Sequence, residues 1–404
     1  MPEGIWLTAL GALCAVLGVL GEPEEPGRKV SLHYNPGFHN TSVNLLHVRA
    51  VDNSSTIHYV WSTIGAPTVL LIYTSNAHSE LHVNWTKLLS PSPHGAISIE
   101  PADSVLYATA LLFNRIFEYW DVNNTADFSG TDGKYFYPAY NLSDFHWENT
   151  NATLNSSSLT ANLTGRSISD PAESFQNGSV TFRVSAYGSS GRDLASPRLL
   201  HNANCSKLEF LLSGVNPRGN NSRFAMEMVA LEKKDGRKKI ESVRSIDDEY
   251  TPTVFEVAQL LPDTPNASHA LGYLQWKSVA YGSTNGKREE AHPCRFYTLR
   301  GVNGTLEVPS IVHAFFGEDL TERYNVEAFN ISFGVADGDF YVKHKFLSWS
   351  SLIGYGTPPK DSFSTLVICI MAVALGTPLG LLILGAIVVA TLKNRVYSNY
   401  EPIN

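Results

Sequence analysis

The sequence predicts a mainly β protein, with two β-sandwich-like domains followed by a single transmembrane α-helix. Short segments rich in Val, Ile, Tyr, Phe and Thr recur between residues 42 and 349 and are separated by clusters of Gly, Pro, Asn and Ser. One long uncharged stretch occupies residues 362–392, and a shorter apolar stretch opens the chain at residues 5–20. This arrangement is typical of an ectodomain that lies between a secretory signal and a membrane anchor.

The N-terminal stretch predicts a cleaved signal peptide, residues 1–21. Its apolar core is shorter than the roughly 20 residues that a membrane-spanning helix needs. Gly21 ends this core, and a Pro-rich acidic segment follows it, as at a cleavage site. The alternative is an uncleaved membrane helix, and the absence of Lys and Arg before the core departs from the usual signal pattern. The length favours cleavage.

The segment from residue 22 to 361 is too long for one expected core. Its 340 residues exceed the roughly 250 to 300 at which a single hydrophobic core stops growing. Gly, Ser, Pro and Asn dominate residues 188–204, so we place a boundary near residue 195. The prediction is two β-rich luminal domains, 22–195 and 196–361, with a short helix at residues 309–316.

Asn-X-Ser/Thr sequons are the main signal of the ectodomain. Fourteen occur, far more than the roughly four expected by chance, and they are absent from the signal, the anchor and the tail. We predict N-glycosylation at Asn40, Asn53, Asn84, Asn123, Asn141, Asn151, Asn155, Asn162, Asn177, Asn204, Asn220, Asn266, Asn303 and Asn330. Glycosylation requires that this part of the chain lies outside the cytosol.

The phase of several sequons places Asn on the solvent face of a strand. In residues 326–335, period-2 alternation puts Phe329 and Ile331 on one face and Asn330 on the other. The same alternation separates Asn162 and Asn84 from their apolar neighbours. We therefore expect these three Asn side chains to be exposed.

The cysteines predict one disulfide. Cys14 lies in the signal and Cys369 in the anchor, which leaves Cys205 and Cys294 in an oxidising compartment. A bridge between them would close a loop of about 90 residues and contribute roughly 4 kcal/mol through the unfolded state.

Residues 362–392 predict the membrane-spanning helix. The segment has no charged side chain, and Lys393 and Arg395 follow it, which places the C-terminus in the cytosol and makes the chain a type I membrane protein. Ala372, Gly376 and Gly380 repeat every fourth residue, a pattern of small residues that lets a second helix approach closely within the lipid bilayer.

The cytosolic tail, residues 393–404, contains a predicted sorting signal. Tyr400-Glu-Pro-Ile403 has the form Tyr-x-x-bulky apolar, which offers an aromatic and an aliphatic anchor to a clathrin adaptor. The expected destination is the endosome and lysosome.

Charge and motifs exclude several classes of function. The net charge of −8 argues against nucleic-acid binding, which needs a basic surface. No catalytic, phosphate-binding or dinucleotide-binding motif appears, so we expect no cofactor and no enzymatic activity. His78 and His82 have zinc-like spacing, but a strand pattern around them disfavours a metal site. Two alternatives stay open: a membrane-tethered hydrolase with paired carboxylates, and an adhesion-type receptor.

Over its full length the chain resembles the glycosylated lysosomal membrane proteins. The resemblance rests on the signal, the dense sequons, the Cys205 and Cys294 pair, and the ending Tyr397-Ser-Asn-Tyr400-Glu-Pro-Ile403-Asn404. It implies an accessory subunit that binds a polytopic lysosomal dipeptide transporter of the major facilitator type. It also implies that the subunit protects this partner from lysosomal proteases.

Overall fold

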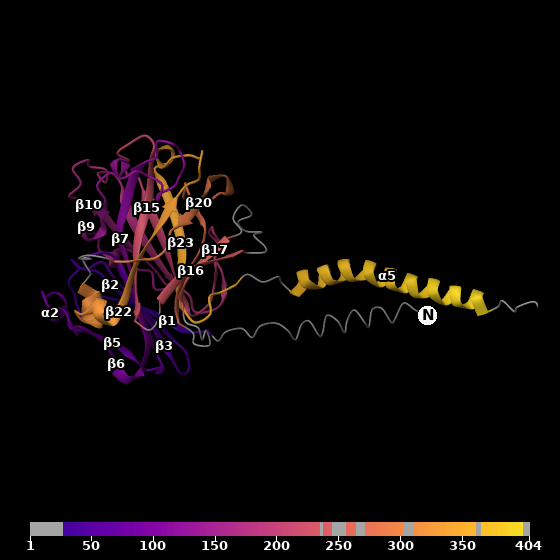
Figure 1. The fold of residues 1–404 in the computed structure, drawn as a ribbon. Helices are drawn as coiled ribbons and strands as arrows, with labels where there is room; N and C mark the ends of the chain where they lie inside the picture. The colour runs from indigo at the N-terminus through magenta and orange to yellow at the C-terminus, as the bar shows by residue number, and fades with distance from the viewer. Residues whose placement is uncertain are drawn as a thin grey trace, which may run out of the picture. The chain divides into compact units, whose positions relative to one another are not determined.

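The computed structural model describes residues 27–234, 237–244, 256–263, 271–302, 310–360 and 365–398. Residues Glu25–Lys360 form one compact unit, which we call the β unit, and the helix α5 (Thr365–Ser398) belongs to a second unit. Figure 1 shows the strands of the β unit and the single long helix. The predicted sequons Asn266 and Asn303 lie outside the described residues, and so do the predicted sorting residues Tyr400 and Ile403.

Ten strands form the first large sheet, sheet I, within the described part of the chain. Its hydrogen-bonded order is β1-β2-β3-β4-β7-β15-β22, with β8 beside β7 and with β20 and β21 beside β22. The strands are β1 (Lys29–Tyr34), β2 (Leu45–Val51), β3 (Thr56–Ser62), β4 (Thr68–Thr74), β7 (Val105–Trp120), β8 (Tyr140–Asn141), β15 (Ser222–Lys233), β20 (Ala291–Phe296), β21 (Arg300–Gly301) and β22 (Tyr324–Phe333).

The second large sheet, sheet II, has the order β9-β10-β11-β14-β23-β18-β17-β16, with β19 also beside β23. Its strands are β9 (Phe145–Trp147), β10 (Thr160–Ser167), β11 (Ser179–Ala186), β14 (Cys205–Ser213), β16 (Arg237–Arg244), β17 (Glu256–Asp263), β18 (Gly272–Lys277), β19 (Val279–Tyr281) and β23 (Phe346–Tyr355). All pairings are antiparallel, and β20 connects the sheets because it pairs with both β19 and β22.

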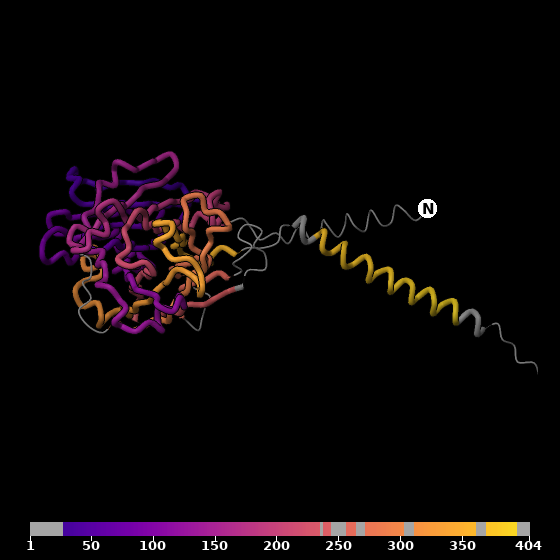
Figure 2. Tube along the Cα trace, turned by 90° about the horizontal axis from the view of Figure 1, so that it is seen from above, coloured from indigo at the N-terminus to yellow at the C-terminus, as the bar shows by residue number. Residues whose placement is uncertain are grey.

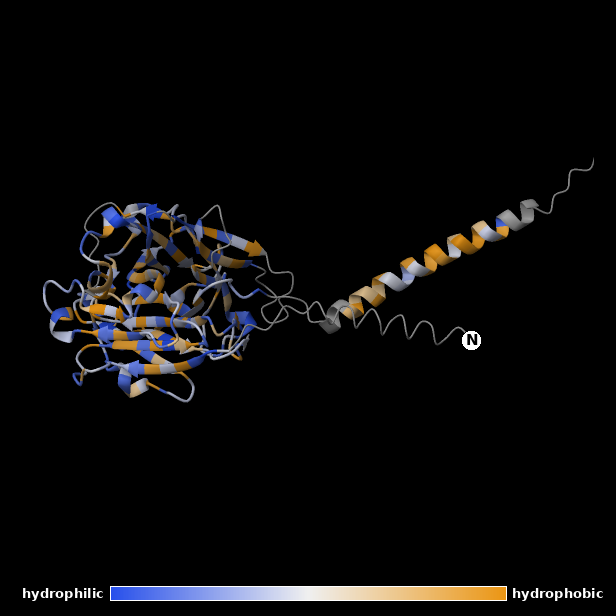
Figure 3. Ribbon diagram, turned by 90° about the horizontal axis from the view of Figure 1, so that it is seen from below, coloured by the Kyte–Doolittle hydropathy of each residue, from blue (hydrophilic) through white to orange (hydrophobic). Residues whose placement is uncertain are grey.

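The two sheets pack face to face around one hydrophobic core. Phe113 of β7 meets Phe182 of β11 with ring centroids 4.8 Å apart, and Trp276 of β18 lies 6.5 Å from Phe329 of β22. These buried side chains belong to one contiguous cluster that draws on both sheets. Side chains that alternate along the strands supply this core, as Figure 3 shows by the alternation of hydrophobic and hydrophilic residues.

Short elements cover part of the outer face of sheet I. They are α2 (Trp85–Leu88), α3 (Ser310–Phe316), α4 (Leu320–Arg323) and the hairpin of β5 (Glu80–Val83) with β6 (Ile97–Glu100). Trp85, Ile99 and Ile311 pack there against Leu70 and Val229 in a second apolar cluster. Helix α3 confirms the short helix that the sequence predicts at residues 309–316. The central strands β3, β4 and β15 are consequently buried on both faces along almost their whole length, and β3 is buried at every position.

The remaining elements are single turns and a small hairpin. The 3₁₀ turns are η1 (Ala102–Ser104), η2 (Gly133–Tyr135), η3 (Leu142–Asp144), η4 (Thr150–Thr153), η5 (Arg288–Glu290) and η6 (Tyr341–Lys343). The hairpin consists of β12 (Gly191–Arg192) and β13 (Leu200–His201).

The mainly β class is confirmed, but the boundary near residue 195 does not divide the β unit. Both sheets contain strands from before and after this position, as the interleaved colours along the chain in Figure 2 illustrate. The Gly- and Ser-rich segment forms the β12–β13 hairpin between β11 and β14, which are neighbours in sheet II. Turn-forming composition therefore marks a connection between adjacent strands here and not a linker between domains.

Candidate functional site

Most sequons of the described residues lie on the surface of the β unit. The exposed Asn side chains are Asn40, Asn53, Asn84, Asn123, Asn141, Asn151, Asn155, Asn177 and Asn220, and those of Asn162 and Asn204 are half-buried. On β10 the predicted alternation holds, because Ala161 and Leu163 are buried in the core while Asn162 points away from it. The β unit thus has room for glycans at many points of its surface.

Asn330 contradicts the predicted solvent face. Its side chain is only 1 % exposed, and its Oδ1 atom has no hydrogen-bond partner among the described residues. Tyr297, directly after β20, continues alongside β22: its backbone N–H donates to the Asn330 carbonyl at 3.0 Å, and its hydroxyl lies on the Asn330 face of the strand, 3.1 Å from Ser332 Oγ. Alternation separates the two faces of β22 correctly, but both faces are covered.

Asn84 is exposed as predicted, although its local structure is different. Strand β5 ends at Val83, and Asn84 is the N-cap of α2, where its Oδ1 accepts a hydrogen bond from the Lys87 backbone N–H at 3.1 Å. An N-linked glycan is attached through Nδ2, so the capping oxygen stays available. His82, one of the two histidines with zinc-like spacing, lies on β5 with its Nε2 atom 3.4 Å from the Glu100 carboxylate on β6.

The predicted disulfide between Cys205 and Cys294 is not formed. Cys294 is a free, buried thiol whose Sγ donates to the Lys277 carbonyl at 3.9 Å, whereas Cys205 Sγ donates to the Asn202 carbonyl at 3.3 Å. Cys205 stands at the start of β14 opposite Gly354, and Cys294 pairs with Phe333 on β22. The two cysteines belong to different strands, sheets and apolar clusters, and burial raises the pKa of the Cys294 thiol.

Helix α5 is long and apolar enough to cross a membrane. Its apolar part, Cys369–Lys393, is 25 residues long, and the mean hydropathy of its most apolar stretch is 2.4. At 1.5 Å per residue it extends about 37 Å, compared with roughly 30 Å for the hydrocarbon core of a bilayer. Figure 3 shows the hydrophobic colour along most of this helix.

Small residues occupy one stripe of α5. Ala372, Gly376 and Gly380 are spaced by four residues, so they fall within about 80° of one another around the helix axis. A methyl group added at Gly376 or Gly380 would meet no atom within 4 Å. Pro378 lies inside the helix on a different side, where it removes one backbone hydrogen bond. The stripe is geometrically open to a close neighbour.

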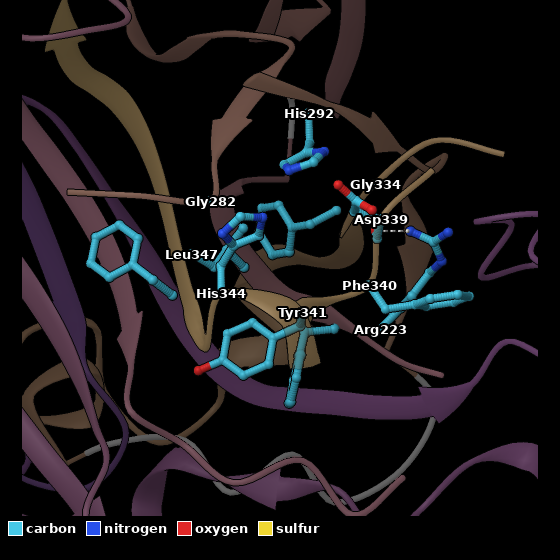
Figure 4. A pocket seen from close by; sticks show the side chains of 12 residues that line it. Arg223, Gly282, His292, Gly334, Asp339, Phe340, Tyr341, His344 and Leu347 are labelled. Carbon is cyan, nitrogen blue, oxygen red and sulfur yellow. Dashed lines mark hydrogen bonds between the residues drawn. The ribbon is translucent and has the colours of Figure 1, made fainter. Parts of the chain in front are cut away.

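A small cleft opens between the ends of the two sheets in the β unit. It encloses about 420 Å³ including its open mouth, and Arg223, His292, Asp339 and His344 are among its lining residues. Figure 4 shows both imidazoles and the Asp339 carboxylate directed toward the same space. A methyl group at Gly282 would approach His292 Nε2 at 3.2 Å and His344 Cδ2 at 3.5 Å, so both rings lie over this glycine.

The charges of this cleft are largely paired. Arg223 Nε donates to Asp121 Oδ2 at 2.6 Å, its Nη atoms donate to the carbonyls of Asp339 and Val335, and Phe340 stacks against the guanidinium. A hydrogen bond from Lys343 keeps the pKa of the Asp339 carboxyl below its usual value. Burial lowers the pKa of the His292 imidazole, partly offset by the Asp339 charge. The hydrogen bonds of Arg223 therefore hold the loop that follows β22 in place.

Sequence patterns could not identify this cleft. Its four polar side chains come from β15, β20, the loop after β22 and the residue that follows η6, and no two of them are neighbours at a recognisable spacing. Among the described residues no group of three His, Cys, Asp or Glu side chains has the arrangement of a metal site.

Comparisons with known proteins agree along the whole chain. A family model described as glycosylated lysosomal membrane protein matches residues 44–396. Glycosylated lysosomal membrane protein A of Xenopus laevis is 69 % identical over 98 % of both chains, and the human glycosylated lysosomal membrane protein is 42 % identical over 100 % of this chain and 96 % of its own length. The zebrafish (Danio rerio) protein of the same name is 41 % identical over 96 % of each. The chain therefore belongs to the glycosylated lysosomal membrane protein family.

Proposed function

We propose that this chain is a non-catalytic accessory subunit that binds a polytopic transporter in the lysosomal membrane and protects it from proteolysis. The observation that carries the proposal is the open stripe of Ala372, Gly376 and Gly380 on α5. A lone spanning helix gains nothing from two glycines spaced four residues apart, because each Gly costs about 1 kcal/mol of helix propensity relative to Ala. The stripe becomes favourable when a second helix packs against it.

The proposed orientation is type I, with the β unit in the lumen. Exposed sequons cover the β unit, and Lys393 stands at the C-terminal end of the apolar part of α5, as expected for the cytosolic end of a span. The partner in this proposal is a transporter of dipeptides of the major facilitator type, as the family resemblance implies. The tail motif at Tyr400 and Ile403 supplies the route to the lysosome through a clathrin adaptor.

Protection follows from the combination of a β fold with surface glycans. Proteases cleave segments that can extend into an active site, which are usually exposed loop tips. Several sequons stand in connections between strands, for example Asn53 between β2 and β3 and Asn123 after β7. Glycans at such sites would keep proteases from the backbone of this chain and from the luminal loops of a partner that it covers.

The cleft supports a non-catalytic reading. Glycosidases need one carboxylic acid with a raised pKa beside a second carboxylate. Among the residues that line the cleft, Asp339 is the carboxylate, and its pKa is lowered by Lys343. The geometry thus favours binding or structural roles for these side chains over acid catalysis.

Co-purification in mild detergent tests the helix contact. The double variant Gly376→Leu with Gly380→Leu should lose most of the polytopic protein that co-purifies with the wild-type chain. Gly385→Leu is the matched control, because position 385 lies about 180° around the helix from Gly376 and its added side chain also meets free space. Equal recovery of the partner with all three chains would refute docking through this stripe.

The lifetime of the co-purified partner tests protection. Asn→Gln substitution at the nine exposed sequons should shorten the partner's half-life in lysosomes severalfold, and inhibitors of lysosomal proteases should restore it. If the half-life is unchanged, or if inhibitors have no effect, the glycans do not shield the partner.

Localisation separates this proposal from an adhesion receptor. Tyr400→Ala should move the protein to the cell surface, while the wild-type chain should co-localise with lysosomal markers. Residence of the wild-type chain at the plasma membrane would favour the receptor.

A further inference from the structure

Trp120 is an exposed aromatic side chain at the end of a buried strand. It is the last residue of β7, and it is 45 % exposed while Tyr119 and Asp121 on either side are buried. It is the one aromatic among the strongly exposed large apolar side chains of the described residues. The ring of Tyr135 stands edge-on to it, with centroids 5.8 Å apart and an interplanar angle of 89°. This contact leaves much of the indole in solvent.

A tight turn places a sequon three residues after Trp120. The Asn124 backbone N–H donates to the Asp121 carbonyl at 3.2 Å, and Asn124 has a φ of 50°. Asn123 is therefore at the tip of a reversal that brings the chain back beside the end of β7. Its side chain is exposed, and so is that of Thr125, the third residue of the sequon.

Buried contacts fix the conformation of this turn. Arg223 donates through Nε to Asp121 at 2.6 Å and through an Nη atom to Asn124 Oδ1. Asp121 in turn accepts the backbone N–H groups of Thr125 and Ala126 at 3.0 and 2.8 Å. These hydrogen bonds hold the backbone on either side of Asn123 in place at the end of β7, three residues from Trp120.

We propose that the indole of Trp120 is a stacking platform for the first sugar of an N-glycan on Asn123, so that this glycan is part of the fold. One face of N-acetylglucosamine presents C–H groups, and these pack favourably on the electron-rich face of an aromatic ring. Stacking also removes apolar indole surface from water. The inference rests on the proposed luminal orientation, because only there is Asn123 glycosylated.

Other aromatics near sequons lack this geometry. Phe175 precedes Asn177 by two residues, but it is 2 % exposed and belongs to the core. Phe38 precedes Asn40 by two residues, but it already stacks on Trp85 with centroids 4.5 Å apart. Trp120 combines a ring that is 45 % exposed, a sequon three residues later and a turn held by buried hydrogen bonds.

A double-mutant cycle on the full-length chain in detergent tests the contact. Trp120→Ala and Asn123→Gln should each lower the midpoint of thermal unfolding by about 2 °C or more. The double variant should unfold no earlier than the less stable single variant, because both changes remove the same interaction. Trp120→Phe should retain part of the stability, since a smaller aromatic face remains.

The matched control uses the exposed sequon at Asn53, which has no aromatic residue among the five positions before it. Asn53→Gln combined with Trp120→Ala should give additive shifts. In parallel, mass spectrometry of the peptide that contains Asn123 measures whether this residue carries a glycan. Additive shifts in the Trp120 and Asn123 cycle with an occupied Asn123 overturn the stacking but leave the proposed function intact. An unoccupied Asn123 overturns the stacking and the predicted glycosylation of this site, while the co-purification test of α5 remains independent.

Discussion

His47 Nε2 lies 2.9 Å from His58 Nδ1 in the interior of the β unit, and both imidazoles are buried. The two rings are nearly parallel, at 7°, with centroids 5.2 Å apart, and His58 Nε2 lies 2.8 Å from Ser79 Oγ. Burial lowers the pKa of both side chains, with repulsion from His58 adding to the effect at His47; the pKa of His58 falls to about 3. The folded protein therefore keeps this pair neutral in mildly acidic solution.

This pair makes stability depend on pH. An unfolded histidine has a pKa of about 6.5, so below this pH the unfolded chain binds a proton at position 58. Folded His58 stays unprotonated until the pH approaches 3. The contribution of His58 to the free energy of unfolding is fully present above about pH 6.5 and is lost as the pH falls toward 3. At pH 5 the loss from His58 is about 2 kcal/mol. Thermal unfolding between pH 7.5 and 5 should show a shallower decline for His58→Gln than for the wild type. His78→Gln is the control at an exposed histidine, and an identical slope in all three chains would contradict the assignment.

Asn330 should carry no glycan in the folded protein. Its side chain and that of Ser332 are each 1 % exposed, and the Tyr297 side chain lies on the same face of β22, which leaves no room for a sugar. Glycopeptide mapping of the mature chain should find Asn330 unmodified and Asn53 modified. A fully occupied Asn330 would mean that this face of β22 is open to solvent in the folded protein.

Cys294 should behave as a free thiol. In the native chain it should resist alkylation, because it is buried and its pKa is raised by burial. After denaturation without reductant, iodoacetamide should modify Cys294 completely. Modification that requires prior reduction would show a disulfide and contradict the strand positions of the structure.

Arg223 should be among the most stabilising polar side chains of the β unit. Its removal leaves Asp121 as a buried, unpaired carboxylate, which typically costs 3 to 5 kcal/mol. Arg223→Met should therefore lower the denaturant midpoint strongly. Arg183→Met is the control, because Arg183 is largely exposed in its pair with Glu209 and should cost less than about 1 kcal/mol. Similar midpoints for both variants would contradict the proposed anchoring of the turn.

Local patterns predicted the strands and the membrane helix because both depend on short-range periodicity. The alternation around Phe329 and Ile331 places these residues in the core, where the structure has them. The run without charges predicts the apolar part of α5. Such signals need no knowledge of distant contacts.

Long-range pairing explains what the sequence analysis missed. The composition around residue 195 is the same for a linker and for a hairpin, and only the pairing of β11 with β14 distinguishes them. Elimination left Cys205 and Cys294 as the pair, but strand register places them apart. Alternation identifies the face on which Asn330 lies, yet it cannot show that side chains distant in the sequence, such as Tyr297, bury this face.

The position of β23 also decides where the chain can be cut. This last strand, Phe346–Tyr355, lies in the middle of sheet II between β14 and β18. A secreted fragment that stops before Phe346 would expose two unpaired strand edges and invite aggregation. A fragment that ends at Lys360 keeps every pairing of the sheet, so the few residues between the strand and the membrane are the place to release a soluble form.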